Sequence, residues 1–332
     1  MLRALIWIGR VLAAILIFLA VAWLLNASWW ASYTAKTTIL AHRGLHQNYS
    51  REDLESDTCT ANRIHAPEHA YLENTLDSMA KAFELGADVV EFDIHPTTDG
   101  QFAVFHDWTL DCRTNGKGVT RDQPMTYLKT LDIGYGYTAD GGKTFPFRGK
   151  FVGAMPTLDE VLARFPDKRF LINIKSRDLD EGRKLAARLK QLPAAQQALL
   201  MSYGGDAPED ALAREMPQMR TMGRKRLTDC LLNYLSYGWA GVVPSACHKT
   251  LILIPANYAP LLWGWSNRFV ERMHSVGSEV FLRGPYGGGT LPAGIDTVEQ
   301  LDAVPKDFPG GIWTDRIDLV AKRWRGDNVT AR

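Results

Sequence analysis

Residues 88–114, DVVEFDIHPTTDGQFAVFHDWTLDCRT, bring two carboxylates and an imidazole together at spacings that can support chemistry. Two runs of β-branched, apolar and aromatic residues flank the Asp-Gly pair at 99–100, which favours a β-hairpin with a two-residue type I′ turn. That turn predicts that Asp93 lies opposite His106. Directly opposed residues share a face of an antiparallel pair, and so does Glu91, two residues before Asp93.

A face of this kind suits the handling of a charged substrate. Two carboxylates two residues apart suit a hard cation, and an imidazole beside them suits proton transfer. The neighbouring side chains are apolar, so the hairpin is expected to be buried on at least one side. Because two buried acids without a counter-charge are costly, we interpret the face as a functional site and not as a solvated surface.

The elements that must position this face alternate between strand-like and helical segments. The predicted strands are the two arms of the hairpin and residues 37–43, 169–175, 198–203, 219–223, 240–245, 279–284 and 310–315. The predicted helices are 74–85, 158–165, 180–192, 207–216, 227–237, 267–276 and 298–304. This rhythm favours an α/β fold of the TIM (β/α)8-barrel type as one domain over 36–332, with nine strand candidates for eight places.

In such barrels the chemistry lies at the C-terminal ends of the strands. Six polar residues fall at those ends, and His106 returns to the same rim through the hairpin. In chain order the six are His42, Arg43, Glu91, Asp93, Asn173 and Lys175. Their convergence indicates a single site at the barrel mouth.

The N-terminal residues 1–35 differ in character from the rest. Arg3 and Arg10 precede a long apolar run, which predicts one hydrophobic helix. Two interpretations stay open: a signal peptide cleaved after residues 20–22, Ala-Val-Ala, or an uncleaved signal anchor with an aromatic belt of Trp23, Trp29 and Trp30. In either case the remainder is expected to be exported, and the anchor interpretation places it outside the cytoplasm (periplasmic or extracellular) but attached to the membrane.

The cysteines agree with export. There are four, with no C-x-x-C spacing, and four cysteines allow three pairings. The simplest pairing joins Cys59 to Cys112 and Cys230 to Cys247. The composition is ordinary for a globular protein, 46% hydrophobic with a net charge of +1, and gives no support for a nucleic-acid partner.

Several separate motifs resemble the glycerophosphodiester phosphodiesterase family. They are AHRG at 41–44, ENT at 73–75, residues 86–118, INIK at 172–175 and GIWTD at 311–315. The resemblance implies a TIM barrel and metal-dependent hydrolysis of a glycerophosphodiester to glycerol phosphate and an alcohol. It also implies that His42 and His106 are the general acid and base, and that Arg43 and Lys175 hold the phosphate. The metal ligands that it implies are Glu91 and Asp93, which would bind one divalent cation, Ca²⁺ or Mg²⁺.

Asn173 departs from the family pattern, which usually has glutamate there. An amide oxygen leaves two ligand charges instead of three and slightly favours Ca²⁺ over Mg²⁺. Four alternatives stay open: weaker metal binding, a preference for calcium, help from an acid of the insertion (Glu52, Asp53 or Glu55), or a site that binds without turnover.

Two further segments depart from the family. Residues 45–70 form an insertion that we expect either to cover the mouth as a substrate lid or to serve as a stabilising loop. Residues 249–265 are apolar and broken by two prolines, so they are too short for a membrane span. They are expected either in the core or as an interfacial loop near the mouth that dips towards lipid.

Three functions follow from the sequence. The first is an anchored glycerophosphodiesterase acting on a small-molecule or lipid-derived phosphodiester. The second is a phospholipase D-like hydrolase of lysophospholipid or sphingolipid head groups. The third is a catalytically inactive barrel that binds phospholipid or glycerol phosphate, with Asn173 as its only support.

Overall fold

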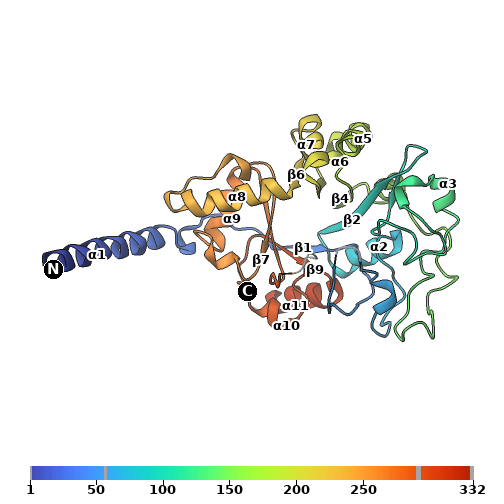
Figure 1. Ribbon diagram of the computed structural model, residues 1–332, viewed down its shortest axis with the longest axis horizontal. Coiled ribbons are helices and arrows are strands. Elements are labelled where there is room, and N and C mark those ends of the chain that lie inside the picture. The colour runs from blue at the N-terminus through green and yellow to red at the C-terminus, as the bar shows by residue number, and fades with distance from the viewer. Residues whose placement is uncertain (1, 56–57, 289–292, 330–332) are drawn as a thin grey trace.

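Eight parallel strands form the core of the computed structural model, which describes residues 2–55, 58–288 and 293–329. They follow the order β6-β5-β4-β2-β1-β9-β8-β7 (Figure 1). Their bounds are β1 Thr38–Ala41, β2 Val89–Pro96, β4 Arg169–Ile174, β5 Leu200–Gly204, β6 Arg220–Gly223, β7 Leu251–Pro255, β8 Glu279–Arg283 and β9 Gly311–Thr314. Thr250 Oγ1 donates to the carbonyl of Thr221 at 2.7 Å, which links β7 to β6 and nearly closes the barrel. The predicted TIM-type barrel is confirmed.

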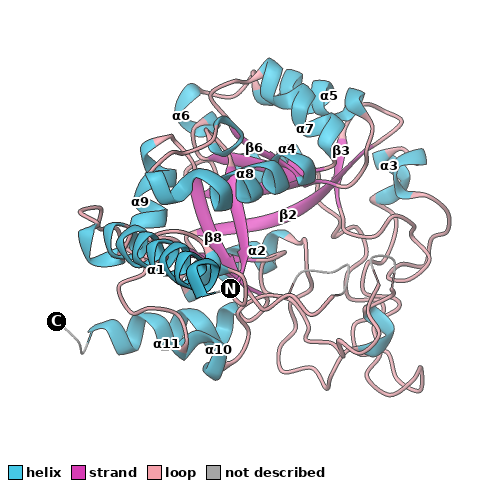
Figure 2. Cartoon of the chain, turned by 60° about the vertical axis from the view of Figure 1, so that its left-hand side comes forward, coloured by secondary structure: helices cyan, strands magenta, loops and turns pink. Residues whose placement is uncertain are grey.

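Helices surround these strands (Figure 2). Their bounds are α2 Leu76–Leu85, α3 Met125–Leu128, α4 Leu158–Arg164, α5 Leu179–Leu189, α6 Ala194–Gln197, α7 Asp206–Glu215, α8 Arg224–Tyr237, α9 Asn267–Ser275, α10 Val298–Asp302 and α11 Ile317–Val329. Short 3-10 turns fill the connections: η1 Ser28–Trp30, η2 Ala61–Arg63, η3 Thr120–Asp122, η4 Gly238–Ala240, η5 Ser245–Cys247 and η6 Ala259–Leu261. Hydrogen bonds between side chains and the backbone fix where several of these helices begin. For example, Thr157 and Glu160 form a capping box at the start of α4.

The surplus strand candidate has a simple explanation. β3, Phe102–Val104, pairs only with β2 and lies outside the barrel. The strand predicted at 240–245 is wrong, because that segment forms η4 and the irregular chain before η5. The eighth barrel strand is instead β7, which lies in the apolar segment 249–265 and is buried along its whole length. The expectation that this segment belongs to the core is therefore confirmed for β7.

The hairpin forms, but its predicted register is wrong. Ile94 pairs with Val104 and Pro96 with Phe102, and the N–H of Thr97 donates to the carbonyl of Gln101 at 2.9 Å, so the loop has three central residues, 98–100, instead of two. Gly100 takes the left-handed conformation, with φ +81°, that such loops require. The Asp99 carboxylate accepts the backbone N–H of Met125 at 3.0 Å, where α3 begins, and this bond helps to fix the longer loop.

The barrel interior explains why the polar residues meet at one end. Leu40, Val89, Leu171, Met201 and Trp313 belong to the apolar cluster inside the barrel. Side chains alternate along a strand, so the inward position two residues further on falls at the mouth. In the same strand order these positions are His42, Glu91, Asn173, Tyr203 and Asp315.

Two disulfide bonds join the cysteines in the predicted pairing, Cys59 to Cys112 and Cys230 to Cys247. The first closes a loop with a sequence separation of 53 residues and ties the insertion 45–70 to the chain that follows the hairpin. We expect the double change Cys59→Ser with Cys112→Ser to lower the free energy of unfolding by about 2–4 kcal/mol, because the unfolded chain regains loop freedom. Denaturant titration under oxidising conditions measures this. A loss below about 0.5 kcal/mol, within the usual range of a surface substitution, would contradict it.

A buried glutamate makes stability depend on pH. Burial raises the pKa of Glu209, in α7, to about 8 from 4.5, and Ser202 Oγ lies 2.7 Å from its Oε1. Between these pH values the folded chain holds a proton that the unfolded chain has lost. The free energy of unfolding should therefore fall as pH rises, by at most about 1.4 kcal/mol per pH unit from this group. Glu209→Gln should flatten that slope and be the more stable form at pH 8, as measured by denaturant titration from pH 5 to 8.5. The same slope in both proteins would contradict the assignment.

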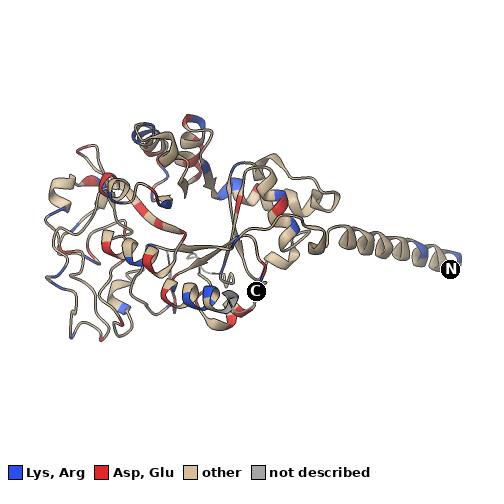
Figure 3. Ribbon diagram, turned by 180° about the vertical axis from the view of Figure 1, so that it is seen from behind, with Lys and Arg blue, Asp and Glu red and all other residues tan. Residues whose placement is uncertain are grey.

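α1, Leu2–Leu25, is the predicted N-terminal hydrophobic helix, and it projects from the barrel (Figure 1). It is the one helix among the described residues that is long and apolar enough to cross a membrane. Basic residues lie only near its N-terminal end (Figure 3). A signal sequence has the same properties, so cleavage or retention stays a prediction.

Candidate functional site

A carboxylate pair on β2 forms the centre of the site. Glu91 and Asp93 are both fully buried and lie on one face of the strand. Glu91 accepts hydrogen bonds from the Tyr203 hydroxyl at 2.7 Å and from the backbone N–H of Arg43 at 3.1 Å. Burial raises the pKa of Glu91 to about 8, and the negative charge of Asp93 adds to the shift. The positive charges of Arg43 and Lys175 only partly offset these two effects.

Asp93 is the point on which the cations converge. Lys175 Nζ lies 3.4 Å from its Oδ1, and Arg43 Nε lies 3.4 Å from its Oδ2. Although burial opposes ionisation, Lys175, His106 and Arg43 together hold the pKa of Asp93 below its ordinary value. A lysine and an arginine that meet at one carboxylate are close enough to share a phosphate.

Asn173 lies beside Asp93 in the β2–β4 register, and its Nδ2 donates to Asp93 Oδ1 at 2.8 Å. Asn74 donates to the other oxygen at 2.9 Å. Two buried carboxylates and an amide make an oxygen donor set that fits a hard cation such as Ca²⁺ or Mg²⁺. A half-turn of the Asn173 amide would present its oxygen in place of its NH2 group.

Each of the two histidines has a carboxylate of its own. His42 Nδ1 lies 2.5 Å from Asp315 Oδ1, and His106 Nδ1 lies 2.7 Å from Asp107 Oδ1. Such a bond fixes the orientation of the ring and leaves Nε2 for proton transfer. His42 Nε2 is 3.8 Å from Glu91 Oε2, so that ring adjoins the carboxylate pair.

The two rings differ in their charged surroundings. Burial lowers the pKa of His106 to about 4, and Arg43 and Lys175 add to the effect. Burial and Arg43 also lower the pKa of His42, but Asp315 and Asp93 oppose the shift. His106 is therefore a neutral imidazole at neutral pH that can accept a proton.

A buried ionic network lies directly behind the site. Glu73 binds Arg43 through Oε1 at 3.1 Å and Arg113 through Oε2 at 2.9 Å. Arg113 also donates from Nε to Asp107 Oδ2 at 2.9 Å, so it connects the partners of Arg43 and His106. These contacts hold Arg43 and His106 in fixed positions relative to each other.

The insertion lies over the same rim. Arg51 NH1 is 2.6 Å from Asp315 Oδ2, and His46 Nε2 is 3.7 Å from Asp315 Oδ1. The ligand atoms of His42, His46 and Asp315 lie within 4.8 Å of one another, so this group offers a second position that could hold a cation. Because Arg51 already balances Asp315, we interpret the group as the support of His42.

The three acids suggested as substitutes for a third metal ligand are not at the site. Glu52, Asp53 and Glu55 are all exposed. The structure instead brings together the seven predicted residues at the mouth, although His106 arrives past the end of β3 and not opposite Asp93.

Sequence reasoning gave no role to four residues that hold the site. They are Glu73, Arg113, Tyr203 and Asp315. Tyr203 and Asp315 could have been noticed, because both stand two residues after an inward apolar position at the end of a strand. Glu73 and Arg113 come from loops, and no strand periodicity indicates them.

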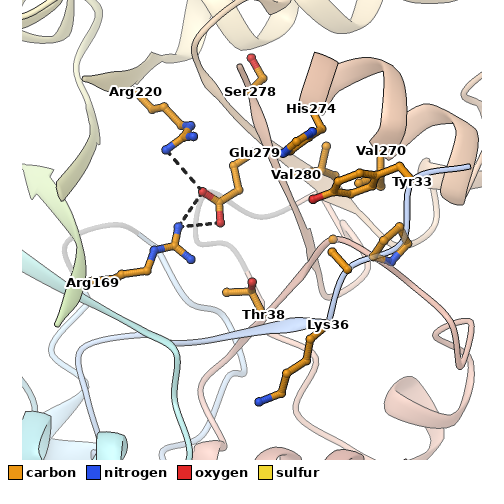
Figure 4. Close-up of a pocket in the computed structure, with 13 residues that line it drawn as sticks. Tyr33, Lys36, Thr38, Arg169, Arg220, Val270, His274, Ser278, Glu279 and Val280 are labelled. Atoms are coloured by element: carbon orange, nitrogen blue, oxygen red, sulfur yellow. Dashed lines mark hydrogen bonds and ion pairs between the residues drawn. The ribbon is translucent and has the colours of Figure 1, made fainter. Parts of the chain in front are cut away.

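A separate hollow of about 350 Å³ lies at the other end of the barrel (Figure 4). It is lined by residues at the N-terminal ends of strands, among them Thr38, Arg169, Arg220 and Glu279. It contains none of the carboxylates and histidines described above. In TIM-type barrels the chemistry lies at the opposite face, so this hollow is not the candidate active site.

The fold and the site define an α/β-barrel hydrolase with an acidic, two-histidine mouth, and comparison with known proteins agrees. Residues 42–202 match the model of the glycerophosphoryl diester phosphodiesterase family. A glycerophosphodiester phosphodiesterase of Caldanaerobacter subterraneus subsp. tengcongensis is 32% identical over 297 residues, which cover 86% of this chain and 99% of the relative. The chain therefore belongs to the glycerophosphoryl diester phosphodiesterase family, whose members are phosphoric diester hydrolases.

Solved structures show the same fold. A glycerophosphodiester phosphodiesterase of Agrobacterium tumefaciens aligns with a TM-score of 0.58 at 24% identity, covering 88% of this chain and all of the other. A phosphodiesterase of Oleispira antarctica, solved with the product sn-glycerol-3-phosphate, aligns with a TM-score of 0.51 at 18% identity, covering 87% and 95%. At these identities the likeness supports the barrel and not the details of the site.

Proposed function

We propose that this protein hydrolyses glycerophosphodiesters to glycerol phosphate and an alcohol, with one divalent cation and two histidines. The observation that carries the proposal is the pair of carboxylate-bound imidazoles, His42 with Asp315 and His106 with Asp107, both within reach of the charge of Arg43. Two oriented imidazoles beside a cationic centre are what a phosphodiester needs, because its negative charge repels nucleophiles.

Arg43 and Lys175 would bind the non-bridging phosphate oxygens, and they lie near enough to each other to do so through their shared contact with Asp93. Glu91, Asp93 and Asn173 would hold the cation. When bound, the cation would neutralise charge that builds up on the phosphate oxygens. The raised pKa of Glu91 supports this, since burial and the charge of Asp93 disfavour the ionised carboxylate, and a bound cation would stabilise it.

His106 suits the base and His42 the acid. His106 would take a proton from the attacking water molecule as the new P–O bond forms. His42 would protonate the departing alkoxide oxygen as the old P–O bond breaks. The positive charge of Arg43 lowers the pKa of His42 in the free protein, and a bound phosphate would offset that charge.

The test uses the full chain, stripped of metal with a chelator and then titrated with Ca²⁺ or Mg²⁺. We expect release of glycerol phosphate from glycerophosphocholine to be absent without cation and restored by either ion, with Ca²⁺ somewhat the better. Hydrolysis that is unaffected by chelation would overturn the metal dependence. Binding of the substrate without turnover would instead favour a catalytically inactive barrel that binds phospholipid or glycerol phosphate.

Asn173 gives a specific prediction on the cation. Asn173→Glu should tighten cation binding by about tenfold or more, because it adds a third ligand charge. Without cation it should lower the free energy of unfolding, since another buried carboxylate joins Glu91 and Asp93. Asn173→Gln is the matched control, with the same length and no charge. Equal cation affinity in the two variants, measured by calorimetry, would show that residue 173 is not a ligand.

We further propose that α1 is retained as a membrane anchor and that the barrel lies outside the cytoplasm. The two disulfide bonds and the basic residues near the start of α1 support export. The 24 residues of α1 extend about 36 Å, enough for a hydrocarbon core of about 30 Å.

A further inference from the structure

An apolar corner of the domain lies at the end of α8. Between Asp229 and Lys249 the sequence contains no Asp, Glu, Lys or Arg. Leu232, Leu235 and Trp239 follow one another at spacings of three and four residues and are 59%, 38% and 41% exposed. Val242, which follows η4, is also exposed. Exposed apolar side chains that gather in this way mark a contact with a partner.

α1 packs against this corner. The rings of Phe18 and Trp239 are 5.0 Å apart, edge to face. The buried Asn26 side chain donates to the carbonyl of Trp239 at 2.8 Å. Phe18 precedes the end of α1 by seven residues, which corresponds to about 10 Å along the helix axis. The ring of Trp239 therefore lies beside the helix about two turns before its end, whereas its carbonyl lies at the end of the helix.

Tryptophans also surround the point where α1 joins the domain. Trp23 and Trp29 have ring centroids 6.0 Å apart, and Trp30 Nε1 donates to the carbonyl of Leu24 at 2.8 Å. All three are exposed. Tryptophan is enriched where a membrane protein passes from hydrocarbon to water.

We propose that Leu232, Leu235, Trp239 and Val242 form a membrane face that inserts into the bilayer entered by α1. The proposal rests on the proposed retention of α1 as an anchor. A helix in the hydrocarbon region carries whatever packs against its interior to the same depth, so contact with Phe18 places Trp239 below the head groups. The absence of Asp, Glu, Lys and Arg in 231–247 lowers the cost of that position, and the Arg272 guanidinium beside this segment donates to the carbonyl of Gly238 at 2.9 Å and to the Tyr234 hydroxyl at 3.0 Å.

The hollow at the N-terminal ends of the strands lies at the end of the barrel that the linker from α1 enters. Its charge is complementary to that of anionic lipid head groups (Figure 4). Lys36, Arg169 and Arg220 line it against a single carboxylate, Glu279, which Arg169 binds at 2.7 Å. Three cations against one anion leave a formal charge of +2. Tyr33 and Lys36 belong to the linker that follows α1, so the hollow is lined in part by that linker and suits anionic head groups.

This orientation narrows the substrate class. The linker enters β1 at its N-terminal end, whereas His42 and Asp315 stand at C-terminal ends. α1 and the loops of the mouth lie on opposite sides of the barrel (Figure 1). The mouth then faces away from the bilayer, and the substrate is a water-soluble glycerophosphodiester and not a lipid held in the membrane.

The experiment measures the depth of Trp239 in the full chain reconstituted into vesicles of phosphatidylcholine with brominated acyl chains. Trp239→Phe is conservative and isolates one tryptophan as the difference between two spectra. We expect the difference spectrum to be blue-shifted and to lose at least half of its intensity in brominated vesicles. Trp108→Phe is the matched control, because Trp108 is 45% exposed and belongs to the chain just after β3, with its ring centroid 5.8 Å from that of His95.

The Trp108 difference spectrum should be unquenched by brominated lipid. If Trp239 is equally unquenched, the membrane face is wrong. A blue-shifted but unquenched Trp239 in a dimeric protein would assign the face to a second copy of the chain and overturn the proposal. The measurement involves no turnover, so its failure is distinct from failure of the proposed activity.

A second arm tests the head-group charge. With brominated phosphatidylglycerol added, Trp239 should be quenched more strongly than in phosphatidylcholine alone, and Lys36→Gln should reduce that difference. Equal quenching of Trp239 with and without phosphatidylglycerol would show that the hollow does not bind anionic head groups.

Discussion

Replacing His106 with alanine should lower kcat for a glycerophosphodiester by about 10²–10⁴-fold, the usual contribution of a positioned acid or base. The ring is buried, bonded to Asp107, and neutral at neutral pH because burial lowers its pKa to about 4. Alanine keeps Arg43, Lys175 and the carboxylate pair, so substrate binding should change less than turnover. The measurement is glycerol phosphate release under saturating substrate.

Two comparisons make this result specific. His42→Ala should cause a loss of the same order, since His42 occupies the equivalent position against Asp315. His65→Ala, in the insertion and exposed, should leave kcat unchanged. All three variants should be checked for folding by thermal unfolding. A folded His106→Ala protein with full activity would remove His106 from the mechanism.

Replacing Arg113 with methionine should lower the free energy of unfolding by about 3–5 kcal/mol, the cost of breaking a buried ion pair from one side. Arg113 is 2% exposed and binds Asp107, Glu73, the Tyr137 hydroxyl and Thr60 Oγ1. Methionine has a similar length but satisfies none of these acceptors. Denaturant titration measures the loss.

The same substitution should also lower activity, because Asp107 would no longer be held against His106. Arg148→Met is the matched control, since Arg148 is exposed and contacts the rings of Tyr135 and Phe145. That change should cost at most about 1 kcal/mol. Equal losses in the two variants would show that the buried network does not carry the expected energy.

Strand periodicity explains which parts of the site were predictable. Inward positions recur every second residue, so the end of each strand places His42, Glu91 and Asn173 at the mouth without further knowledge of the fold. The partners of these residues depend on which strands are neighbours. Asp315 meets His42 only because β9 pairs with β1, and a single sequence does not show that pairing.

Local conformation explains the errors. The Asp-Gly pair indicated a two-residue turn, but the side chain of Asp99 binds the start of α3, and the loop has one residue more. Residues 240–245 contain two valines and resemble a strand, whereas the buried strand β7 lies in a longer apolar run where periodicity does not distinguish it from core.

The central claim is the identity of the bond that is broken, and ³¹P NMR of the products tests it most directly. With glycerophosphocholine, full-length protein and Ca²⁺, we expect the diester signal to be replaced by that of glycerol phosphate. With the His106→Ala variant, we expect the diester signal to remain unchanged. Lysophosphatidylcholine in vesicles should be turned over far more slowly. No diester cleavage with either cation, or cleavage of the lysolipid alone, would contradict the account.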